Sequence, residues 1–432
     1  MSLAFHFSRP FIVLLLFPAL LTAQLTVNQD RLEQSILELG RIGQNEAGAQ
    51  RVAFSDEDLA GRDYTIQLMK DAGLEVTIDY AGNIIGRRAG EDADAKPISF
   101  GSHVDTVPNG GNYDGCVGSM ASIEVVRTLN DAGITTAHPL EVIIFSNEEG
   151  GVMGSRAMSG ELPASALEVV NSTGYSMGEG IVRLGGDINR LQEVIRKPGD
   201  MEAFVELHIE QGGLLEQKGL QIGIVEGIVG LNWWDVTFKG FANHAGTTPM
   251  DQRKDALLAA ARFIQEVNAS ALDREGNQVA TVGRIKALPG APNVIPGEVV
   301  LSLEIRDLSS EVIQAVYKDI TERAKAIEKD SGVSITFEEL STTGKPALTD
   351  KQVQQHIQTS TESLGYTYQY MPSGAGHDAQ DMAPIVPTGM IFVPSRGGIS
   401  HSPDEFTSAE DMANGANVLL HTVLRLDGQA PK

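Results

Sequence analysis

Cysteine and basic side chains are scarce in this chain. Cys116 is the single cysteine, so no intrachain disulfide can form and a packed core must hold the fold. Lys and Arg number 33 against 57 Asp and Glu, and the resulting net charge of −24 disfavours nucleic acids and anionic membrane surfaces as partners. A small anionic substrate would therefore need a local positive group or a bound metal at its site.

The N-terminus carries an apolar run that is too short to span a membrane. Residues 1–23 contain Arg9, an apolar segment at 11–17 and small residues at the exit, which is the layout of a secretory signal. The alternative to cleavage after Ala23 is retention as a membrane anchor. Cleavage is favoured because a spanning helix needs roughly 20 apolar residues and this run is shorter. We expect a secreted or periplasmic protein without stable membrane insertion after signal removal.

The next part of the sequence alternates helical and strand patterns. Residues 29–46 and 55–73 have the periodicity of amphipathic helices, and Ser55 is a plausible N-cap of the second. Residues 75–80 alternate as a strand, and 140–146 form the apolar run of a buried strand. This order predicts an α/β fold.

After His208 the pattern changes to closely spaced strands with two helices among them. The strand patterns are at 222–225, 235–238, 278–282, 299–305 and 333–337, and the helical ones at 253–268 and 310–329. Candidate site motifs fall before and after this segment, so the catalytic domain is predicted to be discontinuous. Its parts are 24–225 and 343–432, with 226–342 as an inserted lid.

Two acidic motifs follow predicted strands in the first half. His103 and Asp105 lie two residues apart after the strand at 97–100. If that strand continues, their side chains would point from the same face of it, at its carboxyl end. Asp114 follows in a loop rich in Gly, Pro and Asn, and Glu148-Glu149 follow the strand at 140–146. Open α/β sheets place their chemistry at such carboxyl edges.

Two later histidines complete a candidate metal site. His208 and His401 stand in HIEQG and HSPDE, and imidazoles converging with carboxylates are the ligands that such a site needs. Each motif alone is more often a polar strand end than a ligand set. His377 could compete with His401, but we interpret it as structural. We expect the remaining candidates at the surface: His138, His356 and His421.

Eight motifs together resemble the M20 zinc amidohydrolases. The resemblance is to the branch that holds N-carbamoyl-L-amino acid hydrolases, β-ureidopropionase and allantoate amidohydrolase. It implies a mixed sheet flanked by helices, as in zinc exopeptidases, and an α+β lid or dimerisation domain with a four-stranded sheet and two helices. The motifs occur in the order HVDTVPNGGNYDG, NEEGG, HIEQG, NHAGTTPM, PNVIPGEV, EIRD, SGAGHDA and HSPDE.

The resemblance also implies two divalent metal ions per subunit, with zinc the first choice and manganese or cobalt the alternatives. Asp114 would bridge them, His103 and His208 would complete one ion, and Glu149 and His401 the other. Glu148 would be the general base. Asp105 would accept a hydrogen bond from His103 and fix its tautomer.

The lid is expected to supply the contacts to the substrate. By the same resemblance His244 would donate a hydrogen bond to the developing oxyanion. Asn293 and Arg306 would hold the substrate, Arg306 by a bidentate contact to the carboxylate of the substrate. Gln211 and Gly376 would line the cleft. Lid residues of the family can act across a dimer interface, so we expect a homodimer.

The expected activity is hydrolysis of the ureido C–N bond of an N-carbamoyl-L-amino acid or a related ureido acid, with release of ammonia and carbon dioxide. The alternatives are an allantoate amidohydrolase and an exopeptidase or aminoacylase of the M20 type. A binding protein that has lost catalysis is more distant, because it would require metal ligands to be missing.

Overall fold

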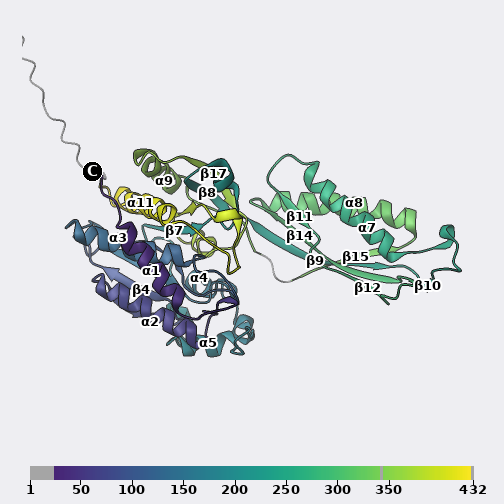
Figure 1. Cartoon of the computed structure of the whole chain (residues 1–432), viewed down its shortest axis with the longest axis horizontal. Coiled ribbons are helices and arrows are strands. Elements are labelled where there is room, and N and C mark those ends of the chain that lie inside the picture. The colour runs from purple at the N-terminus through teal and green to yellow at the C-terminus, as the bar shows by residue number, and fades with distance from the viewer. Residues whose placement is uncertain (1–23, 341–343, 430–432) are drawn as a thin grey trace, which may run out of the picture.

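The computed structural model describes residues 24–340 and 344–429. The predicted signal segment 1–23 lies outside the described residues. In the described part, no helix combines the length and the apolar character needed to cross a bilayer. Figure 1 shows a catalytic part built around a large sheet and an elongated lid that projects from one side of it.

The catalytic part is built on a nine-stranded mixed sheet. The strand order is β16-β8-β18-β7-β5-β6-β4-β3, and β17 also pairs with β8. At its centre β18, β7, β5 and β6 are parallel neighbours. The strands are β3 (Glu75–Ile78), β4 (Ile84–Arg88), β5 (Ile98–His103), β6 (Leu140–Phe145), β7 (Ala203–Ile209), β8 (Ile222–Ile228), β16 (Ala347–Leu348), β17 (Tyr368–Ser373) and β18 (Thr388–Val393).

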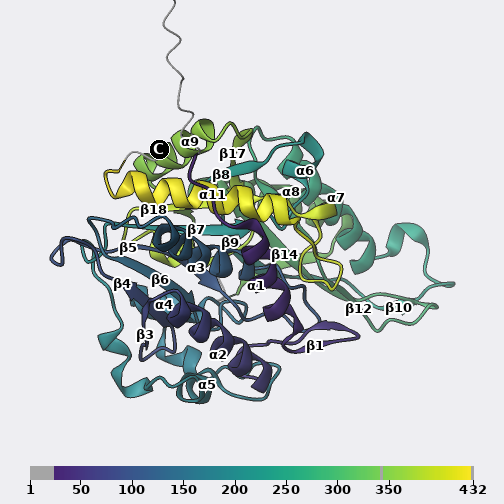
Figure 2. The same ribbon diagram turned by 60° about the vertical axis from the view of Figure 1, so that its left-hand side comes forward.

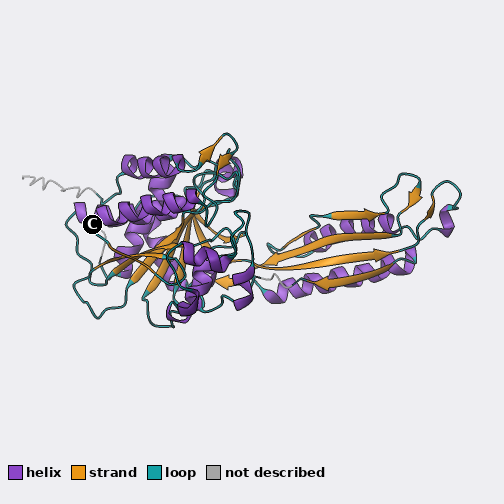
Figure 3. Cartoon of the chain, turned by 90° about the horizontal axis from the view of Figure 1, so that it is seen from below, coloured by secondary structure: helices purple, strands orange, loops and turns teal. Residues whose placement is uncertain are grey.

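Helices cover both faces of this sheet (Figure 3). The strands β5, β6 and β7 are buried along their whole length, as expected of parallel strands covered on both sides. Figure 2 shows α11 and α3 lying across one face. The helices are α1 (Gln29–Arg41), α2 (Asp56–Asp71), α3 (Cys116–Asp131), α4 (Met153–Ser159), α5 (Met177–Arg183), α6 (Leu214–Lys218), α9 (Lys351–Ser363), α10 (Asp378–Met382) and α11 (Ala409–Leu426). A short hairpin of β1 (Gln44–Asn45) and β2 (Gly48–Ala49) follows α1.

The lid is one sheet with two helices on one of its faces. Its long strands β9 (Gly230–Lys239) and β14 (Glu298–Asp307) pair antiparallel, and β15 (Ser334–Glu339) adds to β9. The short β11 (Val279–Thr281) and β12 (Ile285–Leu288) share the place beside β14, so the sheet has four strand positions. The helices α7 (Ala256–Leu272) and α8 (Ser310–Ser331) bury Phe238, Phe263 and Ile320 against it. The predicted fold class is confirmed, lid included.

A two-stranded ribbon forms the tip of the lid. It pairs β10 (Asn243–His244) with β13 (Val294–Ile295), just before β14 begins. The ten residues of β14 run back from this end toward the catalytic part, and at about 3.3 Å per residue they span about 30 Å. Figure 1 shows β10 at the far end of the lid.

Three sequence expectations differ from the structure. The first helix ends at Arg41 rather than at 46, because Gly43 turns the backbone with a φ of +74° and the β1–β2 hairpin begins. The strand β8 stays in the catalytic sheet to Ile228, so the chain enters the lid at 230 rather than at 226; the expected lid end at 342 lies outside the described residues. His421 is buried in α11, where its Nε2 lies 2.8 Å from the Leu25 carbonyl oxygen.

Candidate metal centre and active site

The site stands at the carboxyl edge of the four parallel central strands. β5 ends at His103, β7 carries His208, and β6 leads directly into the turn at 147–149. β18 leads into the loop that contains His401. Because these strands are parallel neighbours, their carboxyl ends meet at one edge and bring together side chains almost three hundred positions apart.

Asp114 lies at the centre of this cluster. Its Oδ1 is 3.2 Å from His208 Nε2 and 3.8 Å from His103 Nε2. Its Oδ2 is 3.4 Å from His401 Nε2, which is in turn 3.4 Å from Glu149 Oε2. The two oxygens of one carboxylate therefore face two separate groups of ligand atoms: His103 with His208, and Glu149 with His401.

The imidazoles are oriented as metal ligands require. His103 Nδ1 lies 3.0 Å from the Asp105 carbonyl oxygen, and His208 Nδ1 lies 2.9 Å from that of Ile209. These carbonyls accept the Nδ1 protons, so each Nε2 presents its lone pair to the cluster. Within the described chain His103 Nε2 is buried without a hydrogen-bond partner, an unsatisfied atom that a metal ion would satisfy.

A glycine keeps the space beside these rings open. Gly115 has a φ of +64°, and a Cβ built on it would lie 2.2 Å from His103 Nε2. Any larger residue would therefore fill the space between His103 and Asp114. The sequence Asp114-Gly115 is needed for the cluster and not only for the turn.

Burial and mutual repulsion perturb the acids of the site. Burial, followed by the charge of Asp114, raises the pKa of Glu149 to about 8. Burial and the charges of Asp378 and Glu149 hold the pKa of Glu148 well above its usual range. So many carboxylates gathered in one buried place favour cations, and the described residues fit divalent metal ions.

Glu148 lies beside the cluster and Asp105 supports it from behind. Glu148 Oε2 is 3.6 Å from His103 Nε2, and its carboxylate is nearly buried. The Asp105 carboxylate accepts hydrogen bonds from the backbone N–H groups of Glu148 and Glu149, both at 3.2 Å. The acceptor that fixes His103 is therefore the Asp105 backbone carbonyl, since the nearer carboxylate oxygen is 3.7 Å away. The side chain of Asp105 instead holds the Glu148-Glu149 turn in place.

Glu405 is a site residue that sequence reasoning missed. Its Oε1 accepts the backbone N–H groups of Tyr113 and Asp114 at 2.8 and 3.0 Å. Its Oε2 accepts the Ser400 hydroxyl at 3.0 Å and the His401 N–H at 3.3 Å. One buried carboxylate thus ties the loop of Asp114 to the loop of His401. The acidic end of HSPDE was the available signal.

Gln211 contacts the centre directly. Its Nε2 donates to Asp114 Oδ2 at 2.6 Å, while its buried Oε1 has no partner in the described residues. Gln211, His401 and Asn147, which precedes Glu148, all have positive φ values near 50°. Such strained backbones are retained where the surroundings fix them, and here they cluster at the site.

His377 is in neither of the two groups at Asp114, but it packs against His208 and forms with His208 and Glu206 a third group of possible ligand atoms. Its ring centroid lies 4.4 Å from that of His208, and its Nε2 lies 2.8 Å from Ser373 Oγ. The neighbouring Asp378 is buried and accepts the Ser155 hydroxyl at 2.6 Å. Gly376 is exposed and directly precedes His377, two residues after Gly374, whose carbonyl accepts a hydrogen bond from Arg306 of the lid.

The lid residues divide between its two ends. Arg306 is at the catalytic end, where its Nη1 donates to the Gly374 carbonyl at 2.7 Å. His244 and Asn293 are exposed at the tip, joined by the hydrogen bond from Ala245 N to the Asn293 carbonyl. Because the tip is about 30 Å along β14 from the catalytic part, neither meets the metal-type cluster of its own chain.

The His244 ring is nevertheless set for donation. Its Nδ1 accepts the backbone N–H groups of Gly246 and Thr247 at 3.0 and 3.2 Å. The proton of a neutral imidazole must then be on Nε2, which is the tautomer that can donate to an oxyanion.

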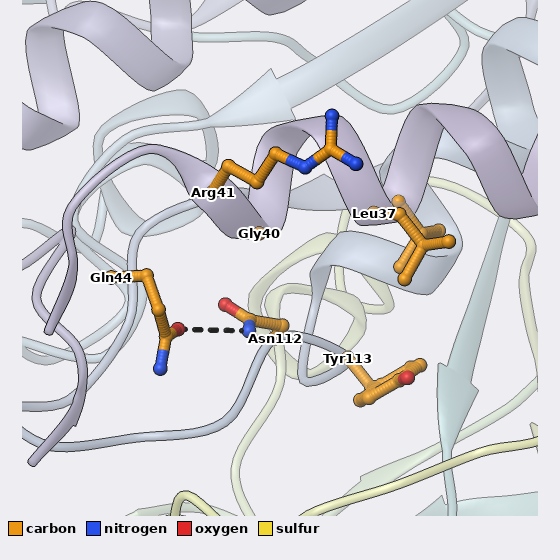
Figure 4. A pocket seen from close by; sticks show the side chains of 7 residues that line it. Leu37, Gly40, Arg41, Gln44, Asn112 and Tyr113 are labelled. Carbon is orange, nitrogen blue, oxygen red and sulfur yellow. Dashed lines mark hydrogen bonds between the residues drawn. The ribbon is translucent and has the colours of Figure 1, made fainter. Parts of the chain in front are cut away.

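A surface hollow of about 350 Å³ is lined by none of the candidate ligands (Figure 4). It is bounded by the C-terminal turn of α1 and the loop before Asp114, where Asn112 Nδ2 donates to Gln44 Oε1 at 3.0 Å. No imidazole or carboxylate lines it, so the chemistry is assigned to the buried cluster.

The model of peptidase family M20/M25/M40 matches residues 99–425, which include all five candidate ligands. The chain belongs to this family. It is 46% identical to an N-carbamoyl-L-amino acid amidohydrolase of Geobacillus stearothermophilus, over 93% of this chain and 99% of that protein. It is 34% identical to an allantoate amidohydrolase of Bacillus subtilis, over 88% and 93%. A solved hydantoinase/carbamoylase family amidase of Burkholderia multivorans is 37% identical, with a TM-score of 0.88 over 94% of this chain and 99% of that one. This M20 chain is accordingly a hydrolase.

Proposed function

We propose that this M20 hydrolase cleaves N-carbamoyl-L-amino acids, adding water to the ureido carbon and releasing the amino acid, ammonia and carbon dioxide. The observation that carries the proposal is the convergence of two imidazole–carboxylate groups on the oxygens of Asp114, with Glu148 beside them. The similarity to the Geobacillus carbamoylase over nearly the whole chain supports this substrate class.

Two divalent ions would be held by the described ligands, zinc in our proposal. His103 and His208 would hold one, Glu149 and His401 the other, and Asp114 both. When bound, such ions supply positive charge that polarises a carbonyl and lowers the pKa of water.

Glu148 is the proposed proton carrier. Its carboxylate is buried beside His103, and its backbone N–H donates to the Asp105 carboxylate. Burial and the neighbouring acids raise the pKa of Glu148 and so its affinity for a proton; in its ionised form the carboxylate can take a proton from the attacking water and then give it to the departing nitrogen. Arg306 would receive the substrate carboxylate and would supply local positive charge in a chain whose net charge is −24.

His244 is proposed to act in the site of a second copy of the chain. Its Nε2–H is a preset donor, but the tip that carries it is about 30 Å from its own catalytic part. Large apolar side chains are exposed on the lid, which supports a homodimer formed there. They are Phe241, Met250, Leu257, Leu258, Leu272, Val279, Ile285 and Leu288.

A substrate panel tests the proposal. Purified chain loaded with zinc or manganese is incubated with N-carbamoyl-L-amino acids, allantoate, ureidoglycolate, dipeptides and N-acetyl-amino acids, and release of ammonia and free amino acid is measured. We expect the highest kcat/KM on a carbamoyl amino acid. Preferred turnover of allantoate would favour the second relative's activity, and preferred turnover of dipeptides or acylated amino acids would favour the peptidase or aminoacylase alternative.

We further propose that residues 1–23 direct export and are then removed. The charged start, the apolar segment and the small residues at Thr22-Ala23 support this. Mass spectrometry of the protein from an extracytoplasmic fraction should find Gln24 at the N-terminus; a full-length chain in the cytoplasm would contradict it.

A further inference from the structure

The anion-binding arginine of the lid is held by a carboxylate on its own strand. Arg306 Nε donates to Glu304 Oε1 at 2.8 Å, and Arg306 Nη2 donates to Glu304 Oε2 at 3.0 Å. This two-point contact occupies the side edge of the guanidinium. Both side chains are about three-quarters buried, at 26% and 23% exposure, so solvent competes weakly with the contact.

A tryptophan fixes the carboxylate in turn. Trp233 faces Glu304 across the β9–β14 pair, and its indole Nε1–H donates to Glu304 Oε2. Burial opposes the charged form of Glu304, but the bonds from Arg306 and Trp233 outweigh it and lower the pKa of this carboxyl. The group is therefore a charged, fully engaged acceptor rather than a mobile surface acid.

The catalytic part holds the remaining corner of the guanidinium. Arg306 Nη1 donates to the Gly374 carbonyl, in the turn that leads to His377. Arginine has five N–H donors. The three contacts found among the described residues leave one N–H on each terminal nitrogen. One free N–H on each of the two terminal nitrogens is a donor pair that can match the two oxygens of a carboxylate.

We propose that Glu304, with Trp233 behind it, is a positioning residue that presets Arg306 for end-on, two-point binding of the substrate carboxylate. This rests on the proposed role of Arg306. Without Glu304 the guanidinium regains its rotamer freedom, which binding must then remove, and its side edge becomes available to anions of other shapes. Glu304 thereby contributes to specificity for a carboxylate without touching the substrate.

The experiment compares the wild-type enzyme with Glu304→Gln, Trp233→Phe and Arg306→Ala, each metal-loaded. Kinetics are measured on an N-carbamoyl-L-amino acid and on its carboxamide, which lacks the anion. We expect Glu304→Gln to raise KM for the acid about tenfold, the scale of immobilising one long side chain, with kcat within about twofold. kcat/KM for the carboxamide should not change. Trp233→Phe should show the same pattern at smaller amplitude, and Arg306→Ala a larger one.

A matched control is Glu338→Gln, which removes an exposed carboxylate from the same lid sheet. It should leave all constants unchanged. An unchanged or lowered KM in Glu304→Gln, or an equal loss on acid and carboxamide, would overturn the inference. If Glu304→Gln fails to fold, Trp233→Phe decides by the same criteria. The wild-type panel judges the proposed function separately, since the acid–carboxamide comparison can be made on any acylated amino acid that the enzyme turns over.

Discussion

Replacing the Glu148 carboxylate by an amide isolates its role as proton carrier. Glu148→Gln keeps the size of the side chain and leaves every proposed ligand in place, but removes the basic oxygen. We expect kcat to fall by about 10²–10⁴-fold, the usual contribution of a general base. Metal content, measured by elemental analysis, should equal that of the wild type. Retained turnover would remove Glu148 from this role.

Glu405 should matter for metal retention more than for substrate binding. In Glu405→Gln an NH₂ group replaces an oxygen that accepts two hydrogen bonds, so one of the loops at 113–114 and 400–401 loses its tether. We expect metal affinity, measured by competition with a chelator, to fall about 10–100-fold. Asp404→Asn, which alters the exposed neighbouring carboxylate, is the matched control. Equal affinity in the two variants would contradict the tether.

The candidate ligands could be named from the sequence because each lies at or near a predicted strand end or in a glycine-rich loop, within a motif. The hydrogen-bond partners of Glu405 and Asp105 show what could not be predicted. Both carboxylates act by accepting backbone N–H groups of distant segments, and backbone partners leave no residue-type pattern in a sequence. The partnership of Glu304 with Arg306 was hidden for a different reason, since two residues apart on a strand is ordinary spacing.

At the scale of elements, the N-terminus of α2 carries a buried acid that should make stability depend on pH. Asp58 Oδ2 accepts the Phe54 N–H at 2.8 Å, and burial, opposed by Arg62, raises the pKa of Asp58 to about 7. Between pH 4 and 7 the folded chain therefore holds this proton more tightly than the unfolded chain does. The contribution of Asp58 to stability is then greatest at low pH and is lost as the pH rises toward 7.

Asp58→Asn should remove this pH dependence, because an amide does not ionise in this range. The amide oxygen can still accept the Phe54 N–H, so the local contact is kept. We expect the variant to gain stability relative to the wild type between pH 5 and 7.5, by at least about 1 kcal/mol. Urea unfolding of the chelator-treated protein at both values measures the difference. A constant difference between the two proteins at the two values would show that Asp58 is already ionised at pH 5.

The types of the helices and strands could be predicted from the periodicity of the sequence, but the residues at which they end often could not. Ser55 caps α2 as its pattern indicates, with its side chain accepting the Asp58 N–H. The end of α1 depends on a backbone conformation at Gly43, and the extent of β8 depends on pairing with β17 and β18, which lie far along the chain. Local patterns contain no information on such partners.

At the scale of the whole molecule, subunit mixing tests whether His244 acts across a dimer. His244→Ala should lower kcat by about 10²–10³-fold, the cost of losing one oxyanion donor. Glu148→Gln inactivates the group that the catalytic part, rather than the lid, contributes to the site. If the lid tip serves the partner, a mixed dimer contains one site with both groups intact, and random mixing should restore about a quarter of wild-type activity.

The mixture is prepared by refolding or co-expression, and the dimer is verified by light scattering. No recovery in verified mixed dimers would place His244 in the site of its own chain. Mixing each variant with itself is the control.

The discontinuity of the catalytic sheet decides when the centre can exist. β18 lies between β7 and β8, and His401 follows it, so the last part of the chain to leave the ribosome enters the middle of the sheet. A nascent or prematurely terminated polypeptide that stops before 388 has the first four candidate ligands but neither the central strand β18 nor the fifth candidate, His401. The complete set of five candidate ligands can therefore come together only after the last part of the catalytic domain has been synthesised.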